Sequence, residues 1–191
     1  MRLLLSLLLG FTGSLLGQIR FIDAGIFRVE YNEHYEQPQR LWYTVSCTES
    51  LYSRSGLNFY GVDSVHTSND ADYANNVYDK GHLAPAADFA CNETALRQTF
   101  SYLNCALQHE SLNRGPWKAL EDHERQLAQV AQVEVRVELE FSNSQPLPTG
   151  AVVPSHFTKI LTQGDRVWRY RFPNDASVKG RPYSSFLVGS D

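Results

Sequence analysis

Residues 78–89 read YDKGHLAPAADF and residues 101–125 read SYLNCALQHESLNRGPWKALEDHER, and these two segments carry a concentrated set of polar groups suited to chemistry. An imidazole has an ordinary pKa of about 6.5, so His82 can accept a proton near neutral pH. A carboxamide oxygen is a hard, neutral ligand of the kind that Mg²⁺ accepts while it keeps several of its waters, which indicates Asn113 as a metal ligand. Glu121 follows on a predicted helix and is suited to hold a metal-bound water. The two segments together predict a metal-assisted catalytic site.

Three motifs in these segments resemble those of the DNA/RNA non-specific endonucleases, the endonuclease G-like ββα-metal nucleases. The sequence DKGHLAP at 79–85 is similar to the Asp-Arg-Gly-His-x-Ala-Pro box of that family. Residues 102–108, YLNCALQ, resemble its Leu-Ser-Asn-x-x-Pro-Gln strand, and residues 112–121, LNRGPWKALE, resemble its Leu-Asn-x-x-x-Trp-x-x-Leu-Glu helix. Order and spacing agree as well as the letters, and residues 133–191 resemble the closing strands of the family. Two departures are Lys80, where the family has arginine, and Leu107, where it has proline.

The resemblance implies an α+β fold with a mixed, mainly antiparallel sheet around a ββα-metal (His-Me finger) core. It also implies a metal-dependent endonuclease that cuts DNA and RNA with little sequence specificity and leaves 5′-phosphate ends. The implied cofactor is Mg²⁺, with Mn²⁺ as an alternative. The residues that it assigns are His82, Asn104 and Glu121 as catalytic, Lys80 and Arg114 as substrate-binding, and Asn113 as the metal ligand.

Each of these residues also has a plainer structural interpretation. Asn104 can be a buried amide that is satisfied by the backbone, and Lys80 and Arg114 can be solvated surface cations. Along an ideal helix, the eight positions from Asn113 to Glu121 place the two side chains about 80° and roughly 12 Å apart, so we expect Glu121 to act through water or to form only a salt bridge. Two other functions stay open: an exported, catalytically inactive nucleic-acid-binding or immunity protein on the same scaffold, and a phosphodiesterase for a different substrate.

A phosphate-binding arginine is harder to place. The family carries one ahead of a stretch of aromatic residues and aspartate, and Arg54 is the nearby arginine. Its spacing to Phe59 and Asp63 matches the family poorly, so we do not assign it to the site. The net charge of −4 also argues against a protein that grips nucleic acid through a broad basic face, although brief binding helped by a metal ion does not require one.

The N-terminus predicts export. Residues 1–17, MRLLLSLLLGFTGSLLG, read as a signal peptide, because the apolar run follows one positive charge and is too short to span a bilayer comfortably. We therefore expect cleavage after Ser14 or Gly17 and one secreted domain at 18–191 with no stable membrane association after cleavage, and an uncleaved membrane anchor is the alternative. Of the three cysteines, Cys91 and Cys105 would close a short loop in a disulfide and leave Cys47 as a free thiol.

Alternating apolar residues predict the remaining elements. Residues 21–31 and 40–47 are predicted to form a hairpin or two adjacent strands, and 78–83 and 100–107 two further strands. A short helix is expected at 92–101 with Asn92 as N-cap, followed by a helix that begins at 112 or 116 and turns Trp117 and Leu120 inward. Further strands are expected within 133–141, 151–161 and 166–172.

Overall fold

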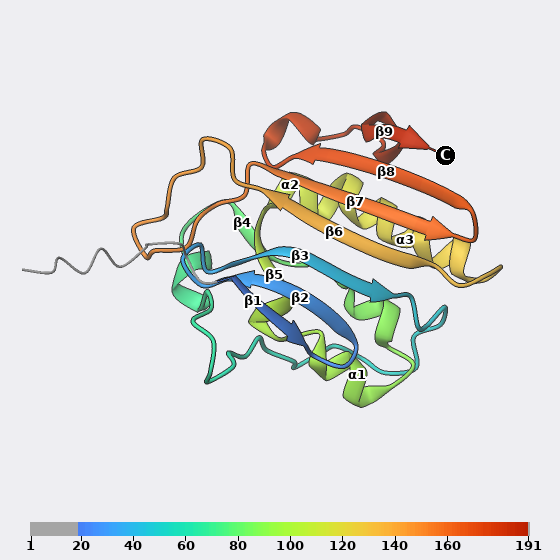
Figure 1. Ribbon diagram of the computed structural model, residues 1–191, viewed down its shortest axis with the longest axis horizontal. Helices are drawn as coiled ribbons and strands as arrows, with labels where there is room; N and C mark the ends of the chain where they lie inside the picture. The colour runs from blue at the N-terminus through green and yellow to red at the C-terminus, as the bar shows by residue number, and fades with distance from the viewer. Residues whose placement is uncertain (1–18, 191) are drawn as a thin grey trace, which may run out of the picture.

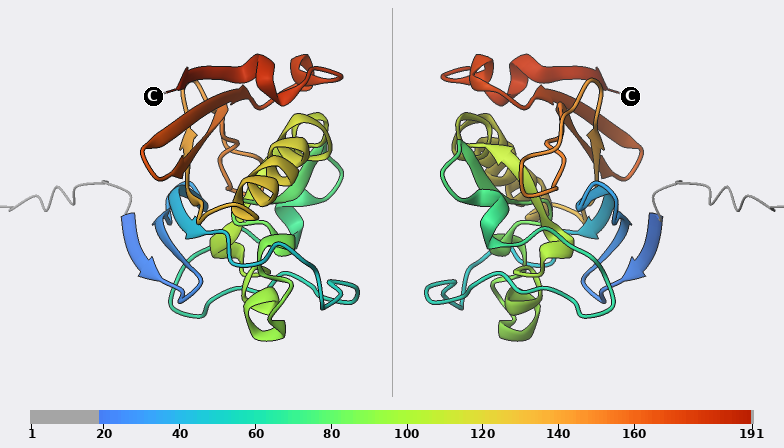
Figure 2. Two further views of the ribbon diagram at one scale, coloured as in Figure 1. Left: turned by 90° about the vertical axis from the view of Figure 1, so that its right-hand side faces the viewer. Right: turned by 90° about the vertical axis from the view of Figure 1, so that its left-hand side faces the viewer.

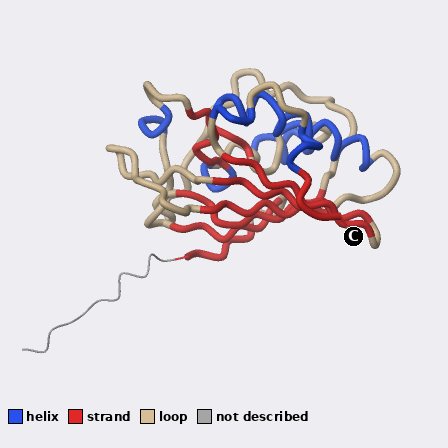
Figure 3. The backbone as a smooth tube through the Cα atoms, turned by 90° about the horizontal axis from the view of Figure 1, so that it is seen from above, coloured by secondary structure: helices blue, strands red, loops and turns tan. Residues whose placement is uncertain are grey.

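The protein consists of two layers, a large β-sheet and a layer of helices and a small hairpin packed on one of its faces (Figures 1 and 3). The computed structural model describes residues 19–190, so the predicted signal peptide at 1–17 lies outside the described residues. Two side views show α3 (Lys118–Ala128) lying over the sheet (Figure 2). No helix within residues 19–190 combines the length and the apolar character that crossing a membrane would require.

The large sheet has seven strands, and every pairing between neighbours is antiparallel. Within residues 19–190 the one parallel contact is an isolated bridge between Tyr60 and Ser101. The predicted α+β class with a mainly antiparallel sheet is confirmed. In spatial order the strands are β1 (Ile19–Asp23), β2 (Phe27–Asn32), β3 (Gln37–Thr44), β6 (Glu134–Glu140), β7 (His156–Gln163), β8 (Arg166–Pro173) and β9 (Leu187–Ser190).

The first predicted strand is divided in two, so the N-terminal part is a three-stranded meander rather than a hairpin. The chain reverses at Gly25, which has a φ of +83°, a conformation that side chains with a Cβ rarely adopt. The Oδ1 atom of Asp23 accepts a hydrogen bond of 2.8 Å from the Gly25 amide and stabilises this turn. The turn divides residues 21–31, whose alternation of apolar and polar residues predicts a single strand.

The core between the two layers is organised around Trp117 at the start of α3. Its ring is fully buried and meets Phe157 of β7 and Phe172 of β8 edge-on, with centroid distances of 5.6 and 5.8 Å. Leu120 is buried one turn later. Because edge-to-face aromatic pairs add to the stabilisation from burial, these contacts fix α3 on the sheet. The predicted inward positions of Trp117 and Leu120 are confirmed.

A second, two-stranded sheet holds the remaining strands, β4 (Tyr78–His82) and β5 (Cys105–His109). It is followed by α2 (Glu110–Leu112) and α3, so the order is strand, strand, helix. Gly81 pairs with Ala106 across the hairpin, and a Cβ on Gly81 would lie 2.6 Å from the Cβ of Gln108. A glycine is therefore required where the two strands approach.

The link between β4 and β5 contains the short helix α1 (Glu93–Gln98). The Oδ1 atom of Asn92 accepts a hydrogen bond of 2.9 Å from the Ala95 amide, which confirms the predicted N-cap. The strand predicted at 100–107 begins later than expected, because residues Tyr102–Asn104 form a 3₁₀ turn that precedes β5.

The predicted disulfide is wrong. Cys47 is bonded to Cys91, with their Cα atoms 5.6 Å apart, while Cys105 is a buried free thiol. The backbone amide of Cys47 binds the carbonyl of Asp88 at 2.9 Å, which brings the end of β3 beside Cys91. Cys105 points instead toward Tyr73, whose hydroxyl lies 3.2 Å from its sulfur. Cys91 and Cys105 are close in sequence, but their places in the fold direct them to different neighbours.

Candidate functional site

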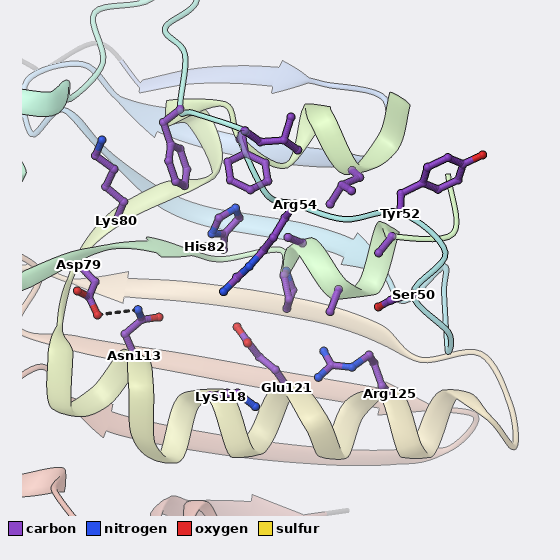
Figure 4. Close-up of a pocket in the computed structure, with 18 of the residues that line it drawn as sticks. Ser50, Tyr52, Arg54, Asp79, Lys80, His82, Asn113, Lys118, Glu121 and Arg125 are labelled. Atoms are coloured by element: carbon purple, nitrogen blue, oxygen red, sulfur yellow. Dashed lines mark hydrogen bonds between the residues drawn. The ribbon is translucent and has the colours of Figure 1, made fainter. Parts of the chain in front are cut away.

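A pocket of about 890 Å³ opens between β4, α3 and the segment of residues 50–59 (Figure 4). Pockets that bind small molecules and cofactors commonly measure about 300–1,000 Å³. Five of the six predicted site residues line this one. They are His82 and Lys80 from β4 together with Asn113, Arg114 and Glu121 from the helical segment that follows β5. The hairpin and the helix therefore bring distant motifs to a single cavity.

His82 is held between two aromatic rings. The centroid of its imidazole lies 4.7 Å from that of Phe59 and 4.8 Å from that of Phe100. Nε2 is buried without a hydrogen-bond partner among residues 19–190, so Nδ1 is the ring nitrogen left to face the pocket. Burial, together with the positive charge of Arg54, lowers the pKa of His82 to about 3. The imidazole is therefore neutral at physiological pH, the form that can accept a proton.

The amide of Asn113 has a fixed orientation. Its Nδ2 donates a hydrogen bond of 2.9 Å to Oδ2 of Asp79, so its oxygen is turned toward the pocket (Figure 4). Arg114 holds the same carboxylate through two hydrogen bonds, of 2.9 Å to Oδ2 and 2.7 Å to Oδ1. Burial favours a higher pKa for Asp79, but the bonds from Arg114 and Asn113 outweigh it and hold the pKa below its ordinary value. Asp79 is thus an ionised acceptor that orients Asn113.

The helix between Asn113 and Glu121 is broken, which changes the expected geometry. Residues Asn113–Trp117 form a wide π-type turn, and Gly115 has non-helical angles of φ −109° and ψ −116°. Pro116 follows directly and cannot donate a backbone hydrogen bond. The separation worked out for a straight helix therefore does not hold. Asn113 and Glu121 both point into the same pocket (Figure 4).

Glu121 is half-buried at the wall of the pocket. Burial raises its pKa to about 7, an effect that Lys159 opposes and Glu124 reinforces. Lys159 and Glu124 form a fully buried ion pair, with 3.0 Å between Nζ and Oε2. Burying a charge is costly unless it is paired, so removing either Lys159 or Glu124 would leave an uncompensated buried charge. The carboxyl group of Glu121 can thus change its charge near neutral pH.

Asn104 is predicted to be catalytic, but its side chain makes no hydrogen bond to His82 and does not line the pocket. Its Oδ1 accepts a hydrogen bond of 2.8 Å from the Ala84 amide, and its Nδ2 donates to the carbonyls of Ala84 and Thr99, both at 2.9 Å. The side chain is completely buried. In this geometry Asn104 ties down the backbone that leaves β4 and so positions His82 indirectly, while a direct catalytic role of its side chain stays a prediction.

The two predicted substrate-binding cations already have anionic partners. The ammonium of Lys80 forms an ion pair with Asp70, and it lies 5.8 Å from the ring centroids of Phe59 and Tyr102. Arg114 is neutralised by Asp79 and by Glu110, which lies 3.0 Å from it. Both cations line the pocket, yet neither offers an uncompensated charge to a phosphate.

Arg54 is the residue that sequence reasoning failed to assign. Its guanidinium points into the pocket toward His82 and Glu121 (Figure 4), and no ion pair binds it within residues 19–190. The amides of Leu51 and Tyr52 both bind the carbonyl of Ala90, at 3.0 and 2.9 Å, and so anchor the segment that carries Arg54. The available signal was an arginine ahead of aromatic residues, and the irregular course of this segment hid it from a comparison of spacing.

The oxygen donors in the pocket suit a hydrated magnesium ion. Asn113 supplies an oriented amide oxygen and Glu121 a carboxylate. No three His, Cys, Asp or Glu side chains in the part of the chain that the structure describes are grouped to hold a metal, so protein ligands alone do not make a zinc-type site there. Mg²⁺ keeps several waters and takes only one or two protein ligands in sites of this kind. The donor set therefore fits the metal that the sequence predicts.

Comparison with known proteins agrees with the motifs. The sequence profile of the DNA/RNA non-specific endonucleases matches residues 15–191. Mitochondrial endonuclease G of Bos taurus is 32% identical over 157 residues, which is 71% of this chain and 52% of that protein. Nuclease C1 of Cunninghamella echinulata var. echinulata is 32% identical over 149 residues, 66% of this chain and 58% of that protein. The chain thus spans about half the length of these curated relatives.

A solved structure confirms the fold. It is described as the EndoG/EndoGI complex, and it superimposes with a TM-score of 0.76 at 23% sequence identity. The match covers 91% of this chain and 81% of the other. Agreement of this extent at low identity shows that the strand order, the hairpin and the long helix are arranged alike in the two proteins.

Proposed function

The chain belongs to the DNA/RNA non-specific endonuclease family, and on this premise we propose that it hydrolyses phosphodiester bonds in DNA and RNA with the help of a divalent metal ion. One observation carries the proposal. A neutral imidazole, an oriented amide oxygen and a carboxylate converge on one pocket that also holds an arginine with no anionic partner among the described residues 19–190. These are the groups that water activation, metal binding and phosphate binding require.

His82 is the general base of the proposed reaction. Its pocket-facing nitrogen takes a proton from a water molecule as the oxygen of that water attacks phosphorus. A pKa of about 3 would make it a weak base, but a bound phosphodiester places a negative charge beside the ring. That charge opposes the effect of the Arg54 guanidinium, which lowers the pKa of His82.

Asn113 and Glu121 provide the proposed metal site. The Asn113 oxygen would ligate Mg²⁺, or Mn²⁺ in its place, and the Glu121 carboxylate would accept a hydrogen bond from a metal-bound water. When bound, the ion supplies positive charge to the nonbridging and departing oxygens of the phosphodiester. Asp79 keeps the Asn113 amide in the orientation that this requires.

Arg54 is proposed to bind the scissile phosphate, with Lys80 and Arg114 at the edge of the site. A guanidinium can hold a phosphate through two parallel hydrogen bonds, whereas Lys80 would first have to leave Asp70. Contacts to phosphate carry no sequence information, so we expect little sequence specificity. Displacement of the 3′ oxygen leaves a 5′ phosphate on the product, as in the family that the chain resembles.

The test is plasmid nicking by purified protein with MgCl₂ or with EDTA. We expect His82→Ala to abolish nicking without loss of the folded state, because the ring contributes only a local contact between Phe59 and Phe100. His34→Ala is the matched control, since His34 is exposed and outside the pocket. Full activity in His82→Ala would reject the assignment. A wild-type protein that binds DNA but never cuts it would favour the inactive-binder alternative, which the negative net charge and the paired state of Lys80 also motivate.

We also propose that residues 18–191 form one exported domain. The disulfide between Cys47 and Cys91 supports this, because such bonds persist mainly in oxidising compartments. N-terminal sequencing of protein recovered from the culture medium of an expressing cell tests it. A chain that stays inside the cell with Met1 in place would contradict export.

A further inference from the structure

The pocket extends well beyond the groups that the proposed chemistry uses. Lys80 and Asp79 lie at one end, His82 and Glu121 lie in the middle, and Tyr52 lies at the other end (Figure 4). Arg125 also lines this far end, where its guanidinium is held by the buried Asp88 at 2.8 Å. Neither Tyr52 nor Arg125 has a part in activating water or binding the metal, so their place in the same cavity needs another explanation.

Tyr52 has no evident role in the fold. Its side chain is 44% exposed. Within residues 19–190 its hydroxyl makes no hydrogen bond and its ring packs against no other aromatic ring. Yet its backbone is firmly held by the bond from its amide to the Ala90 carbonyl and by the nearby disulfide. A large aromatic ring that is fixed at the rim of a cavity but unused by the core is available to a bound molecule.

The surroundings of Tyr52 suit a flat, partly apolar group joined to phosphate. Small apolar side chains, among them Ala86 and Ala90, also line the pocket, and the Ala90 carbonyl accepts the hydrogen bond from the Tyr52 amide. Arg54 enters the pocket from the same segment two positions later. A nucleotide presents this combination, since its base has an apolar face and its phosphate is anionic. Every base has such a face, so stacking of this kind does not depend on sequence.

We propose that the end of the pocket at Tyr52 is a subsite for an unpaired nucleobase next to the scissile phosphate, so that the protein binds single-stranded DNA or RNA in preference to duplex. This inference rests on the proposed nuclease function and specifies its substrate. The base lies against the Tyr52 ring while Arg54 holds the neighbouring phosphate. In a duplex the base must first leave its stack and its partner, a cost that a single strand avoids.

The experiment measures binding in EDTA, where no cleavage takes place. Fluorescence anisotropy compares a labelled oligothymidylate with an oligonucleotide of equal length and phosphate number whose sites are all abasic. We expect the wild-type protein to bind the oligothymidylate about five- to tenfold more tightly, the lower end of what base–aromatic stacking contributes, because the ring is only partly enclosed. Tyr52→Ala should remove this difference and Tyr52→Phe should keep it. Equal binding of the two oligonucleotides by the wild-type protein would refute the subsite.

Tyr60 is the matched control. Tyr60 is 45% exposed, about as much as Tyr52, but it does not line the pocket. Tyr60→Ala should therefore leave the difference in affinity between the oligothymidylate and the abasic oligonucleotide unchanged. An equal loss in both alanine variants would show a general loss of binding and overturn the proposal. Nicking assays with MgCl₂ keep the two ideas apart. Cleavage without base-dependent binding refutes the subsite alone, whereas base-dependent binding through Tyr52 without cleavage refutes the catalytic function alone.

Discussion

Replacing Asp79 by alanine removes the acceptor that orients the Asn113 amide. The hydrogen bond between Nδ2 of Asn113 and Oδ2 of Asp79 measures 2.9 Å, and its acceptor is ionised because Arg114 lowers the pKa of the carboxyl group against the effect of burial. A hydrogen bond to a charged partner contributes about 1.5–3 kcal/mol. Without it the amide can rotate and present nitrogen, which cannot ligate a cation, to the pocket. Loss of groups that support a metal ligand typically lowers metal affinity or activity about 10- to 100-fold.

The assay is the initial rate of plasmid nicking as a function of MgCl₂ concentration. We expect Asp79→Ala to raise the MgCl₂ concentration needed for half-maximal rate, or to lower the maximal rate, by about 10- to 100-fold. Arg114→Ala is the matched control, because it removes a partner of Asp79 but leaves the bond to Asn113 in place. Its magnesium dependence should change much less. Circular dichroism of both variants checks that the fold is intact.

Two results would refute this reasoning. An Asp79→Ala variant with an unchanged magnesium titration would show that the Asn113 amide needs no fixed orientation or is not a ligand. An Arg114→Ala variant whose magnesium titration shifts as far as that of Asp79→Ala would show that the ion pair of Asp79 with Arg114, rather than the bond from Asn113 to Asp79, determines the magnesium dependence.

Three further predictions concern stability. Gly81→Ala should lower the free energy of unfolding by about 1–3 kcal/mol in urea denaturation, because its Cβ would lie 2.6 Å from that of Gln108; an unchanged midpoint would show that the hairpin can spread. Cys47→Ser with Cys91→Ser opens a loop with a sequence separation of 44 and should cost about 4 kcal/mol, to be measured against wild type by thermal unfolding, and a loss under 1 kcal/mol would contradict the loop-entropy estimate. The pKa of His82 is lowered to about 3 on folding, so between about pH 6.5 and 3 the unfolded chain binds a proton that the folded chain does not. The stability of wild type relative to His82→Gln should therefore fall as pH falls through that window, by up to about 1.4 kcal/mol per pH unit, and parallel pH profiles would refute the shift.

Several structural features were predictable because they depend on residues close together in the chain. Asn92 caps its helix through an amide three positions away, and the predicted inward side of α3 follows from the helical repeat of Trp117 and Leu120. Five of the six predicted site residues line one pocket, and motif spacing rather than closeness in the chain identified them.

Other features depend on contacts between segments far apart. Cys91 bonds to Cys47 rather than to Cys105 because backbone hydrogen bonds bring the end of β3 to it, while the register of β5 directs Cys105 to Tyr73. Whether a cation such as Lys80 is free or paired likewise depends on a partner from another element, here Asp70. Spacing in the sequence contains no information about these neighbours.

The amino-acid sequence alone therefore determined the family, the α+β class and five of the groups that meet in the pocket, because motif spacing and periodicity are local properties. Only the tertiary structure decided how those groups are oriented and charged. The helix is broken at Gly115, and Asn113 and Glu121 on either side of the break line one cavity. Hydrogen bonds to the backbone hold the Asn104 side chain outside that cavity, whereas the anchored segment of residues 50–59 brings Arg54 into it. Hydrogen-bond partners and desolvation, which set orientation and pKa, arise only when distant segments pack together.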